Sequence, residues 1–78
     1  MEKEYLKGLI EEILYVWGEP LEISDLCQII AEASKKEIIE ALNDMSIQRE
    51  KSASGLLLKK FGNTYQLVSR NKHHKYFE

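Results

Sequence analysis

The residues best suited to chemistry in this chain are two histidines and one cysteine. His73 and His74 are adjacent, and Cys27 is the single cysteine of the sequence. Neighbouring side chains on a helix point in different directions, so the two histidines make a poor pair of metal ligands. A lone thiol forms no internal disulfide, and the apolar neighbours of Cys27 favour a small buried side chain. We therefore expect no metal site.

The remaining residue patterns do not predict catalysis either. Glu11 and Glu12 lie on the polar side of a predicted helix, where acidic residues are typical of a solvated face rather than of paired catalytic carboxylates. The glycines are not spaced as a phosphate-binding loop. The sequence predicts no enzyme and no cofactor, which leaves binding or assembly as the class of function.

Length and composition predict one small soluble domain. The chain has 78 residues, of which 44% are hydrophobic and 31% are charged. A domain of this size has a thin core, so dimerisation or a second domain would add stability. The apolar runs are too short to span a bilayer, and the acidic N-terminus is unlike a signal peptide. We expect a cytoplasmic protein.

Charge is distributed unevenly along the chain. Residues 1–50 hold twelve acidic and five basic residues, a net charge of −7. Residues 51–78 hold six basic residues and one acidic residue, a net charge of +5. This asymmetry is compatible with contacts between subunits and with nucleic acid binding.

The first predicted helix covers residues 2–17. Gly18 is a good helix stop, and the proline at position 20 blocks continuation. Lys7 belongs to the polar side of this helix, whereas Trp17 is expected in the core. Two neighbouring rows of apolar residues predict a wide buried stripe made of Tyr5, Leu9, Ile13 and Trp17 in one row and Leu6, Ile10 and Leu14 in the other.

Two further helices follow. Ser24 is the expected N-cap of a helix that runs to about residue 31. Ser34 and Glu37 have the spacing of a capping box, which starts a third helix over residues 35–49. The inward row of this helix is predicted to be Ile38, Leu42 and Met45.

Residues 54–70 predict a β-hairpin. Gly62-Asn63 matches a two-residue type II′ turn, which pairs Phe61 with Thr64 and Leu57 with Val68. Residues 21–23 could add a third strand. Three helices and a hairpin make an α+β winged helix over residues 1–70, with 71–78 as a tail or the start of a linker helix.

Both faces of this hairpin carry apolar side chains. One face holds Leu56, Leu58, Tyr65 and Leu67, and the other holds Leu57, Phe61 and Val68. The second face needs a cover, either a partner chain or the tail folded back over it. A homodimer interface is therefore predicted at Leu57, Phe61 and Val68, with Tyr15 and Trp17 as further candidates.

A winged helix also suggests DNA binding as an alternative function. The third helix is too acidic for the major groove, where phosphates repel carboxylates. A transcriptional regulator would instead use the basic residues of the wing and tail, namely Lys59, Lys60, Arg70, Lys72 and Lys75. Direct DNA binding is expected to be weak or absent.

Several segments together resemble a known family. Residues 10–21 form an apolar helix that runs into Gly-Glu-Pro-Leu, and Asp25-Leu26 follows. Gly55-Leu56 then precedes Tyr65-Gln66-Leu67 in the hairpin. In order and spacing, these segments resemble the N-terminal part of segregation and condensation protein B (ScpB), over almost the whole chain.

The resemblance implies a function that the composition does not. Members are cytoplasmic, nucleoid-associated accessory subunits without enzymatic activity. They have two winged helices, form homodimers, and bind the kleisin subunit ScpA and, through it, the SMC ATPase in chromosome condensation and segregation. This sequence ends before a second winged helix, which in the family would carry part of the kleisin surface.

Overall fold

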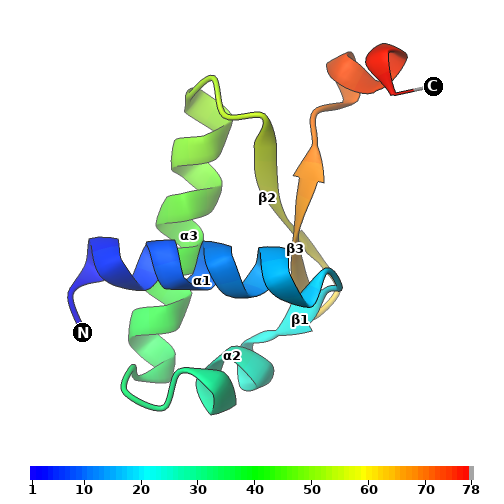
Figure 1. The fold of residues 1–78 in the computed structure, drawn as a ribbon. Helices are drawn as coiled ribbons and strands as arrows, with labels where there is room; N and C mark the ends of the chain where they lie inside the picture. Colours follow the sequence, from blue (N-terminus) through cyan, green and yellow to red (C-terminus); the bar gives the residue numbers. More distant parts are fainter. Residues whose placement is uncertain (78) are drawn as a thin grey trace.

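The structure is a computed structural model that describes residues 1–77, and it has the predicted winged-helix architecture (Figure 1). The three strands form one antiparallel sheet in the order β1–β3–β2. Glu78, the last residue of the predicted tail, lies outside the described residues. In chain order the elements are α1 (Lys3–Trp17), β1 (Leu21–Glu22), α2 (Ile23–Ile29), α3 (Lys35–Lys51), β2 (Leu56–Phe61), β3 (Thr64–Ser69) and the 3₁₀ helix η1 (Asn71–Tyr76).

Local signals set most helix ends as expected. Gly18 ends α1 with a left-handed φ of 67°. The predicted capping box starts α3, because the Glu37 amide donates to Ser34 Oγ at 3.1 Å and the Ser34 amide donates to the Glu37 carboxylate at 2.8 Å. α3 is longer than predicted and ends at Lys51.

The start of α2 was predicted wrongly. The helix begins at Ile23 rather than after Ser24, and it ends at Ile29. The cause is the strand before it: β1 pairs with β3 and keeps the backbone of Glu22 extended, so the chain turns into the helix directly after the strand. The Asp25 carboxylate then accepts the Glu22 amide at 2.8 Å.

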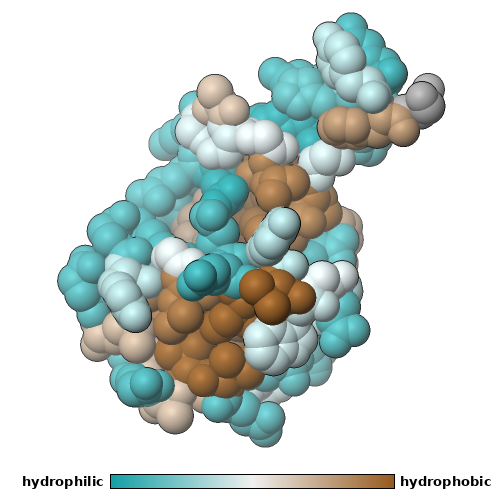
Figure 2. Space-filling view, in the orientation of Figure 1, coloured by the Kyte–Doolittle hydropathy of each residue, from teal (hydrophilic) through white to brown (hydrophobic). Residues whose placement is uncertain are grey.

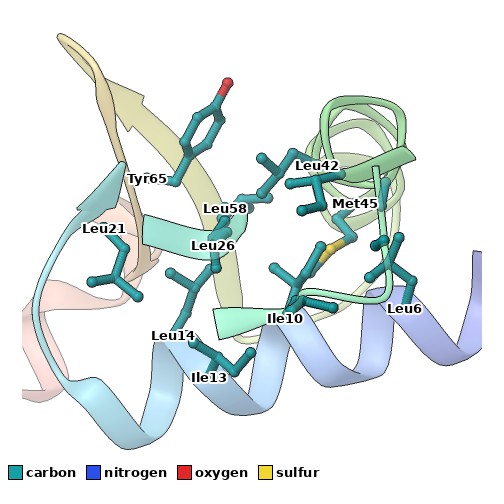
Figure 3. Packing of buried hydrophobic residues seen from close by; sticks show 14 residues of the cluster. Leu6, Ile10, Ile13, Leu14, Leu21, Leu26, Leu42, Met45, Leu58 and Tyr65 are labelled. Carbon is teal, nitrogen blue, oxygen red and sulfur yellow. The ribbon is translucent and has the colours of Figure 1, made fainter. Parts of the chain in front are cut away.

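The core lies where α1 crosses α3, with α2 and the hairpin closing its sides. Figure 3 shows Leu6 and Ile10 of α1 pointing toward α3, and Leu14 pointing toward Leu26 of α2. The buried members include the predicted α3 row of Ile38, Leu42 and Met45. On the hairpin, Leu58 and Tyr65 join this cluster, and half-buried Leu67 packs against it.

Two expectations for α1 were wrong. Tyr5 and Trp17 are exposed rather than buried, with 48% of Trp17 accessible. Lys7, expected in solvent, is buried between α1 and α3. A thin domain offers α1 few neighbours, so one of its two apolar rows is covered only in the middle, at Leu9 and Ile13, and not at its ends.

Ion pairs surround the buried Lys7. Its ammonium donates to Glu4 at 2.8 Å and to Gln48 Oε1 at 3.1 Å, and it lies 3.8 Å from Asp44. Lys3 also pairs with Asp44, and this hydrogen bond lowers the pKa of the Asp44 carboxyl below its usual value. The acidic residues of α3 therefore help to join α3 to α1.

Candidate interaction surfaces

The hairpin has the predicted register and turn. Phe61 lies opposite Thr64, and Leu57 lies opposite Val68. Gly62 has a φ of 61°, and no other described residue of the turn has a positive φ, as a type II′ turn requires. This register fixes which side chains point away from the core.

The outer face of the wing is defined here as Leu57, Phe61 and Val68. Leu57 is only 8% exposed, Val68 is half-buried and Phe61 is 54% exposed. The three residues line a hollow of about 780 Å³, whose rim includes Glu50, Lys59, Arg70 and Lys72. The outer face is thus an apolar strip with a charged border, and its tip is open to solvent.

The tail (residues 71–77) does not cover this face. Its first turn lines one end of the hollow through Asn71, Lys72 and His74. Its aromatic residues point elsewhere: Tyr76 is 72% exposed and Phe77 is 68% exposed. Figure 1 shows η1 projecting from the body beyond the end of β3. The tail thus reaches the hollow only with its first turn, and cover by a partner chain remains a prediction.

Side chains of α3 protect the free edge of β2. Ser46 Oγ donates to the Leu58 carbonyl at 3.3 Å, and Arg49 Nη1 donates to the Leu56 carbonyl at 3.1 Å. These contacts place side chains of α3 against this stretch of β2, which disfavours the addition of another strand there. A partner would contact the face of the wing rather than its edge.

Tyr15 and Trp17 do not join the outer face. Tyr15 is 74% exposed and lines a hollow with Leu56 and Leu67, which lie on the opposite side of the hairpin from Leu57. Trp17 lines another hollow beside α2. The five predicted interface residues therefore divide between two surfaces.

The basic residues proposed for DNA do not form one open patch. Arg70 is half-buried, and its guanidinium donates to three backbone carbonyls: Ser54 at 2.7 Å, Arg49 at 2.7 Å and Ser52 at 2.9 Å. This residue ties the end of β3 to the connector between α3 and β2, a role that the sequence analysis missed. Its Nε and Nη2 donors are therefore not available to phosphates.

Two of the other lysines also have neighbours within the chain. Lys59 donates to Glu50 at 2.6 Å, which lowers the pKa of that carboxyl. The Lys60 ammonium lies 5.8 Å from the centroid of the Tyr65 ring. The DNA-binding alternative thus gains no support from the geometry.

Two other features are absent from residues 1–77. Among residues 1–77, no cluster of three or more His, Cys, Asp or Glu residues is placed to hold a metal ion. Over the same residues, no helix is both long and apolar enough to cross a membrane. Cys27 is half-buried and packs against the core.

Known proteins resemble this chain over most of its length. A segregation and condensation protein B from Clostridium perfringens (strain SM101) is 36% identical over 97% of the chain. Another from Alkaliphilus oremlandii is 33% identical over all of it. The chain spans only 39% and 42% of these relatives.

A solved structure and a family model also match this chain. A crystal structure of a dimer of an ScpB N-terminal domain complexed with an ScpA peptide has a TM-score of 0.86, with 20% sequence identity, and the match covers 95% of this chain and 91% of that one. The sequence model described as segregation and condensation complex subunit ScpB matches residues 8–78. The chain therefore belongs to the ScpB family.

Proposed function

We propose that this chain acts as a non-enzymatic, homodimerising accessory subunit in chromosome condensation and segregation. Its partner would be the kleisin subunit ScpA and, through it, the SMC ATPase. Family membership supports this role, and the similar solved structure is described as a dimer with an ScpA peptide. A cytoplasmic, nucleoid-associated location follows from the role. The division into a winged helix (1–70) and a tail or linker (71–78) belongs to the same proposal.

The outer face of the wing carries the dimer proposal. Phe61 is exposed at the tip of a strip that continues into the almost buried Leu57. An exposed aromatic next to a hollow is the usual anchor of a protein interface, and a charged rim is its usual border. The tail does not occupy the hollow fully, and side chains of α3 lie against the β2 edge. Contact between two outer faces is the arrangement that these observations favour.

The test is the mass of the Phe61→Glu variant in solution. The parent chain should elute with a mass near twice 9.1 kDa in light scattering after size exclusion. A carboxylate at Phe61 should give the monomer mass, because it would face its own symmetry mate across a desolvated contact. Leu57 is a poorer test position, since its burial means that a charge there also threatens folding.

Tyr5→Glu provides the matched control. Tyr5 is also an exposed aromatic, but it lies near the other end of the domain and lines neither surface described above. Its variant should remain dimeric. A Phe61→Glu chain that is folded and still dimeric would remove the wing from the interface. Titration with purified ScpA then tests the kleisin contact separately.

A further inference from the structure

The C-terminal end of α1 carries a second surface that the dimer proposal does not use. Two hollows flank it, one of about 420 Å³ and one of about 310 Å³, and Glu19 lines both. We call this surface the α1 end site. Its defining residues are Tyr15, Trp17, Glu19, Ile29, Leu56 and Leu67.

This surface is unusually apolar for one exposed to water. Tyr15, Val16 and Trp17 are consecutive, and all three are exposed, as is Ile29 nearby. In Figure 2, apolar areas lie on both sides of α1: a larger one beside α2 and a smaller one over the strands. Exposed apolar patches with a polar border mark interaction sites.

The electrostatics of the α1 end site favour a cation. No basic residue lines either hollow, whereas Glu19 lines both and Asp25 lines one. The last turn of α1 also lacks a basic residue, so the negative end of its helix dipole is not compensated there. The matching ligand is a segment that presents large apolar side chains next to lysine or arginine.

The tail of this chain has that chemistry. Lys75 precedes Tyr76 and Phe77, and its ammonium lies 5.2 Å from the centroid of the Tyr76 ring. His73 lies edge-on to Tyr76 and His74 lies tilted against Phe77, with ring centroids 6.4 and 6.5 Å apart, so the 3₁₀ turn holds the rings in two adjacent rows. Both aromatics are exposed.

The tail leaves the sheet beside one border of the α1 end site and turns away from it. Leu56 of the site pairs with Ser69, the last residue of β3, and the tail begins two residues later. Figure 1 shows the tail directed away from α1. This direction favours a second copy over the chain's own body.

We propose that the tail of one copy docks on the α1 end site of a second copy. Tyr76 and Phe77 enter the two hollows, and Lys75 lies against Glu19 and the end of α1. The contact joins the basic end of the chain to its acidic end. This contact does not involve the outer face of the wing, so it can be tested separately from the proposed function.

Trp17 provides a direct readout, because it is the single tryptophan of the chain and lies in the site. The probe is a synthetic peptide of residues 70–77. The acceptor is the full chain with Tyr76→Ser and Phe77→Ser, whose own tail cannot compete. The peptide should shift Trp17 emission saturably below about 1 mM, and the same serine changes in the peptide should weaken binding about tenfold or more.

A charge exchange tests the orientation. Glu19→Lys in the acceptor, or Lys75→Glu in the peptide, should each weaken binding about threefold to fivefold, and the two together should restore it. Glu40→Lys is the control, since Glu40 is an exposed acid on α3 that lines neither hollow. It should change affinity little beyond a general charge effect.

Three results would overturn the proposal. In the first, the wild-type peptide leaves Trp17 emission unchanged. In the second, the peptide binds equally well to the Glu19→Lys acceptor. In the third, Trp17 emission of the parent chain does not depend on concentration, although the serine changes in the tail still alter that emission. The last result would show docking within one chain. The Phe61→Glu variant should still bind the peptide, which separates this outcome from failure of the wing interface.

Discussion

Replacing Arg70 with alanine should destabilise the domain more than any other change of a basic residue in the wing or tail. The Arg70 guanidinium binds three carbonyls of one connector, those of Arg49, Ser52 and Ser54. It fixes the end of β3 to the end of α3. Without it, the hairpin is held at this end only by its contacts with α3.

The size of the effect follows from the three hydrogen bonds. Two of them, at 2.7 Å each, are partly buried, and the third, at 2.9 Å, is exposed. A bond from a charged donor contributes about 1.5 to 3 kcal/mol when buried, and less when water can replace it. We expect a loss of about 2 to 3 kcal/mol, out of a total stability of roughly 4 to 12 kcal/mol for this length. The melting temperature should fall by roughly 10 to 20 °C.

Urea denaturation followed by circular dichroism measures this loss, with Lys72→Ala as the matched control. Lys72 is exposed and two residues away, so its removal should change stability by about 0.5 kcal/mol at most. Arg70→Lys should keep the charge but recover less than half of the loss, since one ammonium cannot span three carbonyls. Equal stability of the Arg70→Ala and Lys72→Ala chains would refute the reasoning. Full recovery in Arg70→Lys would show that charge alone matters.

Three further predictions concern the turn, the buried lysine and acid stability. Gly62→Ala should cost about 1 to 2 kcal/mol by thermal denaturation because its φ is 61°, whereas Gly55→Ala, which has no positive φ and open space, should be neutral or slightly stabilising. Lys7→Glu places a carboxylate in a buried position between two others and should cost about 3 kcal/mol or more, against about 0.5 kcal/mol for Lys36→Glu on the exposed side of α3. The pKa of Glu37 is lowered by a backbone hydrogen bond and by the N-terminal ammonium, so its contribution is present above its usual value of 4.5 and is lost as pH falls through the lowered pKa. Stability should therefore decline below about pH 4.5, and Glu37→Gln should be less stable at pH 7 with a shallower decline in that range; an unchanged slope would contradict this assignment.

The hairpin and the α3 cap were predictable because their causes are local. The type II′ turn depends on Gly62-Asn63, and the register follows by counting outward from it. The capping box needs only Ser34 and Glu37, three residues apart. Each signal lies within a few residues, so tertiary contacts did not have to be known.

The environment of α1 was not predictable in this way. Periodicity identifies two neighbouring apolar rows, but it does not show how many neighbours the domain has to cover them. Lys7 became buried because α3 crosses α1 at that point and supplies Gln48 and Asp44. Trp17 became exposed because the chain turns away into β1 directly after it. Both outcomes depend on packing between elements far apart in sequence.

The interaction surfaces were predictable only in part. Alternation along the hairpin identified Leu57, Phe61 and Val68 as one face, and the register confirms that they share it. The role of Arg70 could not be inferred, because its partners are backbone carbonyls that become neighbours only in the folded connector. No local pattern indicates that Glu19 lies between two hollows, because their walls come from separate elements.

Several contacts outside the main core hold the wing in place. Gly62 fixes its turn, Ser46 and Arg49 occupy the edge of β2, and Arg70 anchors the end of β3. Only one hairpin face contributes to the main core, yet these contacts and the turn constrain the whole hairpin. A surface that is ordered before a partner arrives loses less conformational freedom on binding. If the outer face of the wing is the dimer interface, loss of these contacts should therefore weaken dimerisation as well as folding.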